Sequence, residues 1–189
     1  MHDAPTPPVP AMVIHCCNLL REQLGVLQGR SGLLVGCGSG HEVIYMRRTF
    51  PSDHIVGLDV ETTFSPEALA EGCVLAADAK QLPFRSGTFD FAASFHSLEH
   101  VGDPRPALDE VRRVLRPGGW FYVGVPNRSR LVGYLGSFDA TTWQKITWYL
   151  ADWSDRIRGR FQNVFGSHAG VEGSELLQLL GEQFSNVRL

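Results

Sequence analysis

The chain has 189 residues, of which 43% are hydrophobic and 20% charged, and its formal net charge is −3 at pH 7. These values suit one globular domain that is long enough to bury a core of its own. The negative charge disfavours nucleic acid as a partner, because phosphate backbones are bound by basic surfaces. No apolar run approaches the ~18 residues that a membrane-spanning helix needs, so we expect no membrane span.

The start of the chain and the cysteines give the first expectations about domain organisation. Residues 1–10 are rich in proline and have neither a basic start nor an apolar core, so we predict a flexible tail and not a secretion signal. The four cysteines, at positions 16, 17, 37 and 73, form no C-x-x-C pair, which favours reduced thiols over disulfides or a zinc site. We therefore expect a cytoplasmic protein with a single domain at 11–189 and no metal.

The first predicted elements are a helix, a strand and a glycine-rich loop. Apolar residues recur at helical spacing over Ala11 to Leu27, and the apolar run L-L-V then enters the loop G-C-G-S-G. Gly36, Gly38 and Gly40 let a ligand approach the main chain closely, and the N-terminus of the next helix attracts electron-rich groups. A dinucleotide fingerprint would need its third glycine at His41, and a phosphate-binding loop would need a lysine. The spacing therefore disfavours both a nicotinamide dehydrogenase and a P-loop protein.

The next predicted strand ends on an acidic residue, and another acid follows the strand after it. His54 to Asp59 is predicted as a buried strand, and its last residue comes about 20 residues after the glycine loop. A carboxylate at this position can accept hydrogen bonds from both hydroxyls of a ribose. The alternative is that Asp59 only caps the following segment. A helix within Thr62 to Ala70 and a short strand over Cys73 to Ala76 come next, and the block A-D-A-K-Q-L-P-F follows.

The second half of the chain continues the alternation of strands and helices. Thr88 to Phe95 is predicted as a central strand that opens at its carboxyl end onto a ligand site. A helix over Pro106 to Leu115, a sharp R-P-G-G turn and a fifth strand over Trp120 to Val125 follow. Glu175 to Leu180 is predicted as the last helix, and Phe184 to Leu189 as a sixth strand.

Five blocks in this order resemble the small-molecule, type 11 branch of the class I S-adenosylmethionine-dependent methyltransferases. They are L-L-V-G-C-G-S-G, I-V-G-L-D, A-A-D-A-K-Q-L-P-F, F-D-F-A-A-S-F-H-S-L-E-H-V and E-V-R-R-V-L-R-P-G-G-W-F, and they cover roughly 32–127. The resemblance implies an α/β fold, with a doubly wound, mostly parallel Rossmann-like sheet of seven strands and flanking helices. We expect the usual last antiparallel strand to be missing. The free edge of the fifth strand would then be covered by a helix or by a second copy of the chain in a homodimer.

The resemblance also implies S-adenosylmethionine as the cofactor and assigns residues to it. The three loop glycines would face its methionine part and Asp59 its ribose, while Val60 would pack on the adenine ring. Asp78 and Ala79 would contact the edge of the adenine ring, and Phe95 would lie near the transferable methyl group. The implied cofactor-binding residues are Gly36, Cys37, Gly38, Gly40, Asp59, Val60, Asp78, Ala79 and Phe95. His96 is the candidate catalytic base, or else a pocket residue, because histidine titrates near neutrality.

The sequence therefore favours methyl transfer to a small organic acceptor, with one departure from the family pattern. The family usually has an acidic residue two positions before the first loop glycine, and Leu34 occupies that position here. Losing the carboxylate weakens cofactor binding by about 1–3 kcal/mol if nothing replaces it. A catalytically weak or inactive binding or scaffold protein is therefore the alternative function.

The residues after the fourth strand also match an unrelated motif. His96-x-x-Glu99-His100 has the H-x-x-E-H spacing of a class of zinc peptidases. That motif lies on a helix with both histidines on one face, whereas here it directly follows a predicted strand. The context disfavours a zinc site.

Residues 128–168 are the segment most suited to select the acceptor. They hold three of the four tryptophans, and apolar residues fall on one predicted helical face at Trp143, Ile146, Leu150 and Trp153. Such a face is either part of the core or the underside of a helical lid over an apolar or aromatic acceptor.

Overall fold

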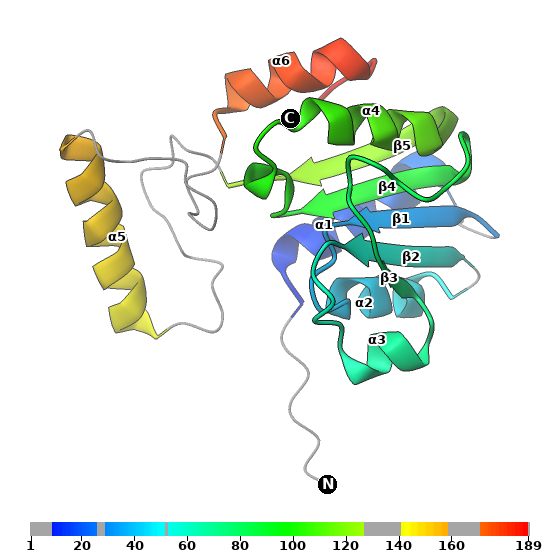
Figure 1. The fold of residues 1–189 in the computed structure, drawn as a ribbon, viewed down its shortest axis with the longest axis horizontal. Helices are drawn as coiled ribbons and strands as arrows, with labels where there is room; N and C mark the ends of the chain where they lie inside the picture. The colour runs from blue at the N-terminus through cyan, green and yellow to red at the C-terminus, as the bar shows by residue number, and fades with distance from the viewer. Residues whose placement is uncertain (1–8, 26–28, 52, 127–140, 159–170, 189) are drawn as a thin grey trace, which may run out of the picture.

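A computed structural model describes residues 9–25, 29–51, 53–126, 141–158 and 171–188. Its centre is a sheet of five strands, all parallel, in the order β3-β2-β1-β4-β5 (Figure 1). The strands are β1 (Ser31–Val35), β2 (His54–Asp59), β3 (Val74–Ala76), β4 (Phe89–Phe95) and β5 (Leu115–Gly124). The order reverses direction between β1 and β4, which makes the sheet doubly wound, as the sequence predicted.

Helices cover both faces of this sheet. The helices α1 (Ala11–Leu24), α2 (His41–Thr49) and α3 (Pro66–Ala70) pack on one face, and α4 (Arg105–Val114) and α6 (Gly173–Gln183) cover the other (Figure 1). Successive side chains of β1 supply the two cores in turn, because side chains alternate across a strand. Leu34 packs with α1 and α2, whereas Leu33 and Val35 pack on the α4 side. Burial on both faces explains why β1 reads as a continuous apolar run.

Local capping explains two of the helix boundaries. The Ser65 hydroxyl accepts a hydrogen bond from the Ala68 N–H at 3.2 Å, and Pro66 occupies the first turn, so α3 begins later than Thr62. At the other end of the first helix, α1 stops at Leu24 because Gly25 adopts a φ of 68°.

The predicted sixth strand is wrong, because residues 184–188 form no strand and the sheet in the described residues has five strands instead of seven. Phe184 instead lies against Phe121 of β5, with ring centroids 5.3 Å apart, on the face that carries α4 and α6. The apolar pattern at the end of the chain therefore reflects packing under α6. The β5 strand also begins earlier than predicted, because Leu115 already pairs with Phe89 of β4, and a register shift then brings Trp120 opposite Phe91.

The remaining described elements are a 3₁₀ turn, η1 (Leu98–His100), and the helix α5 (Thr142–Ile157). Within the residues described, the model contains no helix with the length and apolar content that crossing a membrane requires.

Candidate functional site

The glycine loop is held at the carboxyl end of the sheet by β2. Gly36 and Cys37 donate their N–H groups to the Leu58 carbonyl at 2.9 and 3.0 Å, and the Gly38 N–H donates to Asp59 Oδ2 at 2.8 Å. The three glycines have φ values of 73°, 50° and 87°, a region that other residues rarely adopt. The loop therefore leaves the sheet beside Asp59, at the point where the strand order reverses.

Space above this loop is open at one glycine and closed at another. A Cβ added to Gly38 would meet no atom within 4 Å, whereas one added to Gly36 would lie 2.2 Å from Cβ of Ser97. Gly36 is thus needed for contact with the segment after β4. Gly38 leaves room for a ligand against bare backbone.

The two acids that the sequence assigned to the cofactor follow neighbouring strands. Asp59 Oδ1 accepts from the Glu61 N–H at 3.0 Å, and the Asp59 carbonyl accepts from the Ala77 N–H at 2.9 Å, which holds the segment after β3 beside it. Asp78 Oδ1 accepts from the Lys80 N–H at 2.9 Å. Carboxylate oxygens have further lone pairs, so both acids can still accept hydrogen bonds from a ligand.

Of the three apolar residues assigned to the site, one is exposed and two are half-buried. Val60 is 66% exposed beside Asp59, an unusual position for valine that suits stacking on a flat ring. Ala79 is half-buried against the core on the α4 side, and the Phe95 ring packs toward α1 with its centroid 5.7 Å from that of Tyr122. Of these residues, only Val60 offers a large exposed apolar surface.

Cys37 contributes its main chain alone to this edge of the sheet. The side chain is buried under Gly57, where its Sγ would lie 2.8 Å from an added Cβ. Burial, with the nearby Asp59 charge, raises the pKa of the Cys37 thiol to about 12. The thiol is therefore a core group and not a nucleophile.

His96 directly follows β4 and has a strained backbone conformation. Its φ is 52°, its N–H donates to the Gly124 carbonyl at 2.8 Å, and its side chain is exposed. Its Nδ1 atom lies 3.6 Å from Oε1 of Glu99. The next residue, Ser97, fixes this turn because its hydroxyl donates to the Val35 carbonyl at 3.0 Å.

Glu99 is the residue that the sequence analysis missed. Its side chain has no exposed surface, and neither carboxylate oxygen has a hydrogen-bond partner in the described structure. The sequence analysis considered Glu99 only as part of the H-x-x-E-H spacing, and its distance along the chain from His96 was the only signal. A buried carboxylate without donors is unfavourable and marks a candidate ligand contact.

The H-x-x-E-H pattern does not form a peptidase helix. Leu98–His100 is one 3₁₀ turn and His96 precedes it, so the two histidines do not share an α-helical face. Among the residues that the structure describes, no group of three or more His, Cys, Asp or Glu side chains could hold a metal ion.

Leu34, where the family pattern has an acid, is 1% exposed and packs in the core on the α1 side. Its side chain therefore offers nothing to a ligand at the loop.

Three of the four apolar residues on the helical face in the predicted lid are exposed, and the fourth, Trp153, is half-buried. On α5, Trp143 is 76%, Ile146 41% and Leu150 61% exposed. The interpretation of these three residues as core is therefore wrong. The rest of the predicted lid, at 128–140 and 159–168, lies outside the described residues.

Comparison with known proteins gives a match that covers the sheet. Residues 33–123 match the family model described as "Methyltransferase domain". Among curated proteins, an O-methyltransferase of Aspergillus nomiae is 37% identical over 106 residues, which are 51% of this chain and 47% of that protein. Demethylmenaquinone methyltransferase of Staphylococcus aureus is 33% identical over 105 residues, 52% of this chain and 44% of the other. The chain thus matches less than half the length of these relatives.

Solved structures agree in fold. A SAM-dependent methyltransferase from Thermotoga maritima superposes with a TM-score of 0.56 at 23% identity, covering 91% of this chain and 72% of that chain. A SAM-dependent methyltransferase from Aquifex aeolicus gives a TM-score of 0.52 at 16% identity, covering 77% and 88%.

Proposed function

We propose that the chain transfers a methyl group from S-adenosylmethionine to a small organic acceptor, as a class I methyltransferase of the type 11 branch, whose domain residues 33–123 match. The observation that supports the proposal best is the open backbone at Gly38, joined by a hydrogen bond to Asp59. A glycine loop, a carboxylate at the end of β2 and an exposed Val60 form a cradle with the chemistry that an adenosyl group needs.

Each residue of the cradle has a proposed role. The backbone around Gly38 and Gly40 borders the amino-acid end of the cofactor, Asp59 accepts hydrogen bonds from the ribose hydroxyls, and Val60 packs on the adenine ring. Asp78 accepts from the adenine amino group. When bound, S-adenosylmethionine supplies a methyl carbon on a sulfonium centre that a nucleophilic acceptor can take. Positioning two reactants in this way is worth up to ~7–11 kcal/mol of the barrier.

His96 is proposed to accept a proton from the acceptor. It stands at the carboxyl end of β4, its side chain is exposed, and Glu99 Oε1 faces its Nδ1 atom at 3.6 Å. Because a carboxylate favours a proton on the nitrogen that faces it, the lone pair of Nε2 is left free. His96 would thus act as a base on the side of the site where the acceptor enters.

Calorimetry with S-adenosylhomocysteine, the demethylated product, tests cofactor binding. We expect the wild-type chain to bind it and Gly38→Ala to weaken binding by about tenfold or more, or ~1.4 kcal/mol, because the new methyl group occupies the cradle. Gly87→Ala is the matched control: Gly87 has a φ of 65°, also has open space at its Cβ position, and lies before the amino end of β4. It imposes similar strain away from the cradle.

A binding or scaffold protein that uses no cofactor is the second candidate, and the buried Leu34 favours it. Absence of S-adenosylhomocysteine binding at millimolar concentrations in the folded wild-type chain would reject the enzyme and support this alternative. Equal weakening in the two glycine variants would reject the proposed position of the cradle.

A further inference from the structure

We propose that Glu110 and Arg113, near the end of α4, are positioning residues that hold Asp78 where it accepts a hydrogen bond from the adenine amino group of the cofactor. This inference rests on the proposed function, since it explains what keeps one residue of the cradle in place. The segment 77–88, which carries Asp78, connects β3 to β4 and contains no helix or strand. Its backbone N–H and C=O groups therefore need partners on other elements.

The two side chains of α4 bind both peptide groups of Leu82 in this segment. Glu110 Oε2 accepts from the Leu82 N–H at 2.8 Å, and Arg113 Nη2 donates to the Leu82 carbonyl at 3.0 Å. Arg113 Nη1 also donates to the Phe84 carbonyl at 2.8 Å. Glu110 and Arg113 thus supply the hydrogen bonds that a neighbouring strand would give to a regular segment.

Glu110 and Arg113 also bind each other in a bidentate geometry. Arg113 Nε donates to Glu110 Oε1 at 2.6 Å, and Nη2 donates to Oε2 at 2.7 Å. The hydrogen bonds from Arg113, together with that from the Leu82 N–H, hold the pKa of the Glu110 carboxyl below its ordinary value in spite of desolvation. Four N–H donors of Arg113 are in use. Lysine, with three donors on one nitrogen, cannot reproduce this set.

Leu82 directly follows the turn that carries Asp78. The Asp78 carbonyl accepts from the Gln81 N–H at 2.9 Å, and the preceding Ala77 N–H donates to the Asp59 carbonyl at 2.9 Å. The turn is therefore fixed to the end of β2 on one side and to α4 on the other. Asp78 itself is exposed, so the contacts at Leu82 leave it accessible to a ligand.

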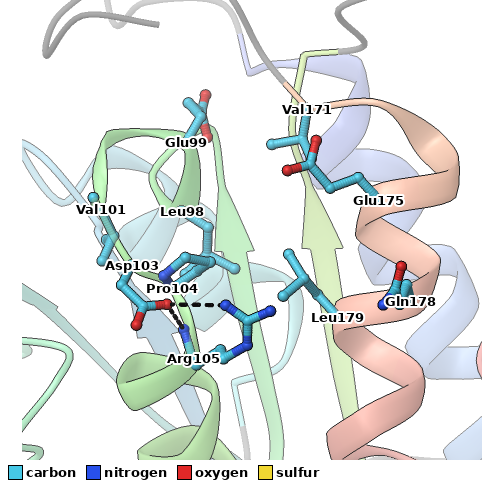
Figure 2. A pocket seen from close by; sticks show the side chains of 11 residues that line it. Leu98, Glu99, Val101, Asp103, Pro104, Arg105, Val171, Glu175, Gln178 and Leu179 are labelled. Carbon is cyan, nitrogen blue, oxygen red and sulfur yellow. Dashed lines mark hydrogen bonds and ion pairs between the residues drawn. The ribbon is translucent and has the colours of Figure 1, made fainter.

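The helix that carries the pair is also fixed at its start. Asp103 Oδ1 accepts from the Arg105 N–H at 3.1 Å (Figure 2), and the Arg105 guanidinium lies 3.6 Å from Glu182 of α6. This end of α4 borders a pocket of about 450 Å³ between η1 and α6 (Figure 2). Leu108 and Val111 of α4 are at most 1% exposed. The helix is therefore a rigid support for the segment that it binds.

The test compares S-adenosylhomocysteine with S-inosylhomocysteine, in which a carbonyl oxygen replaces the amino group of the base. A carboxylate accepts from the amino group but repels the carbonyl oxygen, so we expect the wild-type chain to bind the adenosyl compound at least about tenfold more tightly in calorimetry. Arg113→Lys should lower this ratio to about threefold or less, because the turn with Asp78 loses its fixed position. Glu110→Gln, the second variant, should lower the ratio as well, because its amide binds the guanidinium less strongly.

Arg112→Lys is the matched control. Arg112 precedes Arg113 on the same helix, but its side chain is 60% exposed and lies 3.8 Å from Asp109. This variant should keep the wild-type ratio. In a chain that carries Asp78→Asn, Arg113→Lys should change the ratio no further, because the pair acts through Asp78.

The exchange rate of the Leu82 amide hydrogen measures the contact without a ligand. It should rise at least about tenfold in Arg113→Lys and stay unchanged in Arg112→Lys. An unchanged rate in Arg113→Lys would overturn the inference.

Equal weakening of both compounds by Arg113→Lys, with an unchanged ratio, would also overturn it, because the pair would then only stabilise the fold. If the wild-type chain binds both compounds equally, this inference fails and cofactor binding stands. If it binds neither at millimolar concentrations, the proposed function fails and this inference with it.

Discussion

At the scale of single residues, the contact between His96 and Glu99 has a consequence that can be measured without a substrate. Glu99 Oε1 lies 3.6 Å from Nδ1 of His96 and has no other described partner. A proton on Nδ1 is therefore favoured, although in a free neutral imidazole either nitrogen can carry it. We predict that His96 is the Nδ1–H tautomer when neutral, as read from the ¹⁵N shifts of its ring by NMR.

The variant Glu99→Gln should shift His96 toward the Nε2–H tautomer, because the amide can offer a donor to Nδ1. His54, exposed at the start of β2, serves as the internal reference and should not change. An Nε2–H tautomer for His96 in the wild-type chain would contradict the proposed role of Nε2 as a proton acceptor.

At the scale of elements, Asp90 joins the amino ends of three strands. It accepts from the Ser31 N–H of β1 at 2.8 Å and lies 2.6 Å from Nη1 of Arg116 in β5. Burial raises the pKa of Asp90, but the Ser31 N–H and the Arg116 guanidinium outweigh it, so the pKa falls below its ordinary 3.8. Because the pKa of Asp90 is lower in the folded than in the unfolded state, its carboxylate stabilises the fold at pH values above the unfolded-state pKa. This contribution is lost as the pH falls through the folded-state pKa.

Asp90→Asn should therefore lower the free energy of unfolding at pH 7 by about 1.5–3 kcal/mol, the range for hydrogen bonds to a charged group. The difference between variant and wild type should shrink as the pH is lowered below 3.8. Urea denaturation at several pH values measures both effects. A difference that is the same at pH 7 and pH 3 would show that the charge of Asp90 does not contribute.

The elements themselves were predictable where local pattern and tertiary packing agree. The apolar runs of β1 and β2 and the helical pattern of α4 predicted elements close to those observed, because these segments are buried on the faces that their periodicity indicates. The pattern of residues 184–188 was misleading, since Phe184 packs on Phe121 without joining the sheet. Glu99 was missed because the periodicity of the residues around it does not reveal that its side chain is buried.

The residues of the candidate site were likewise predictable only where a local sequence pattern marks them. Gly38 was predicted from the spacing of the loop glycines, and Asp59 from its position at the end of an apolar strand. The structure joins these two residues by a hydrogen bond. Cys37 was included because of its position in the loop, but its side chain faces the core. The pocket under α6 joins residues more than 60 positions apart, Glu99 and Glu175 among them, so no local pattern could predict it.

At the scale of the whole molecule, α5 carries large apolar side chains that are exposed, among them Trp143, Ile146 and Leu150. Leu150 is 61% exposed, whereas Leu108 of α4 is 1% exposed between the sheet and α6. We therefore predict that Leu150→Gln changes the free energy of unfolding by less than about 0.5 kcal/mol, while Leu108→Ala lowers it by about 2–5 kcal/mol. Urea denaturation at low protein concentration measures both.

Leu150→Gln, together with a variant in β5, also tests whether two copies of the chain associate through α5, as the expectation of a homodimer allows. A contact between subunits makes stability depend on protein concentration, because dissociation precedes or accompanies unfolding. If α5 forms that contact, Leu150→Gln lowers the mass measured by light scattering from dimer to monomer and removes the concentration dependence. If the dimer instead forms along the free edge of β5, the mass is unchanged by Leu150→Gln. The Gly124 carbonyl faces β4, so the main chain of Val123 faces the free edge, and a substitution that blocks pairing there, such as Val123→Pro, lowers the mass. The two variants therefore separate a helix-mediated dimer from an edge-strand dimer, and a monomeric wild-type chain rejects both.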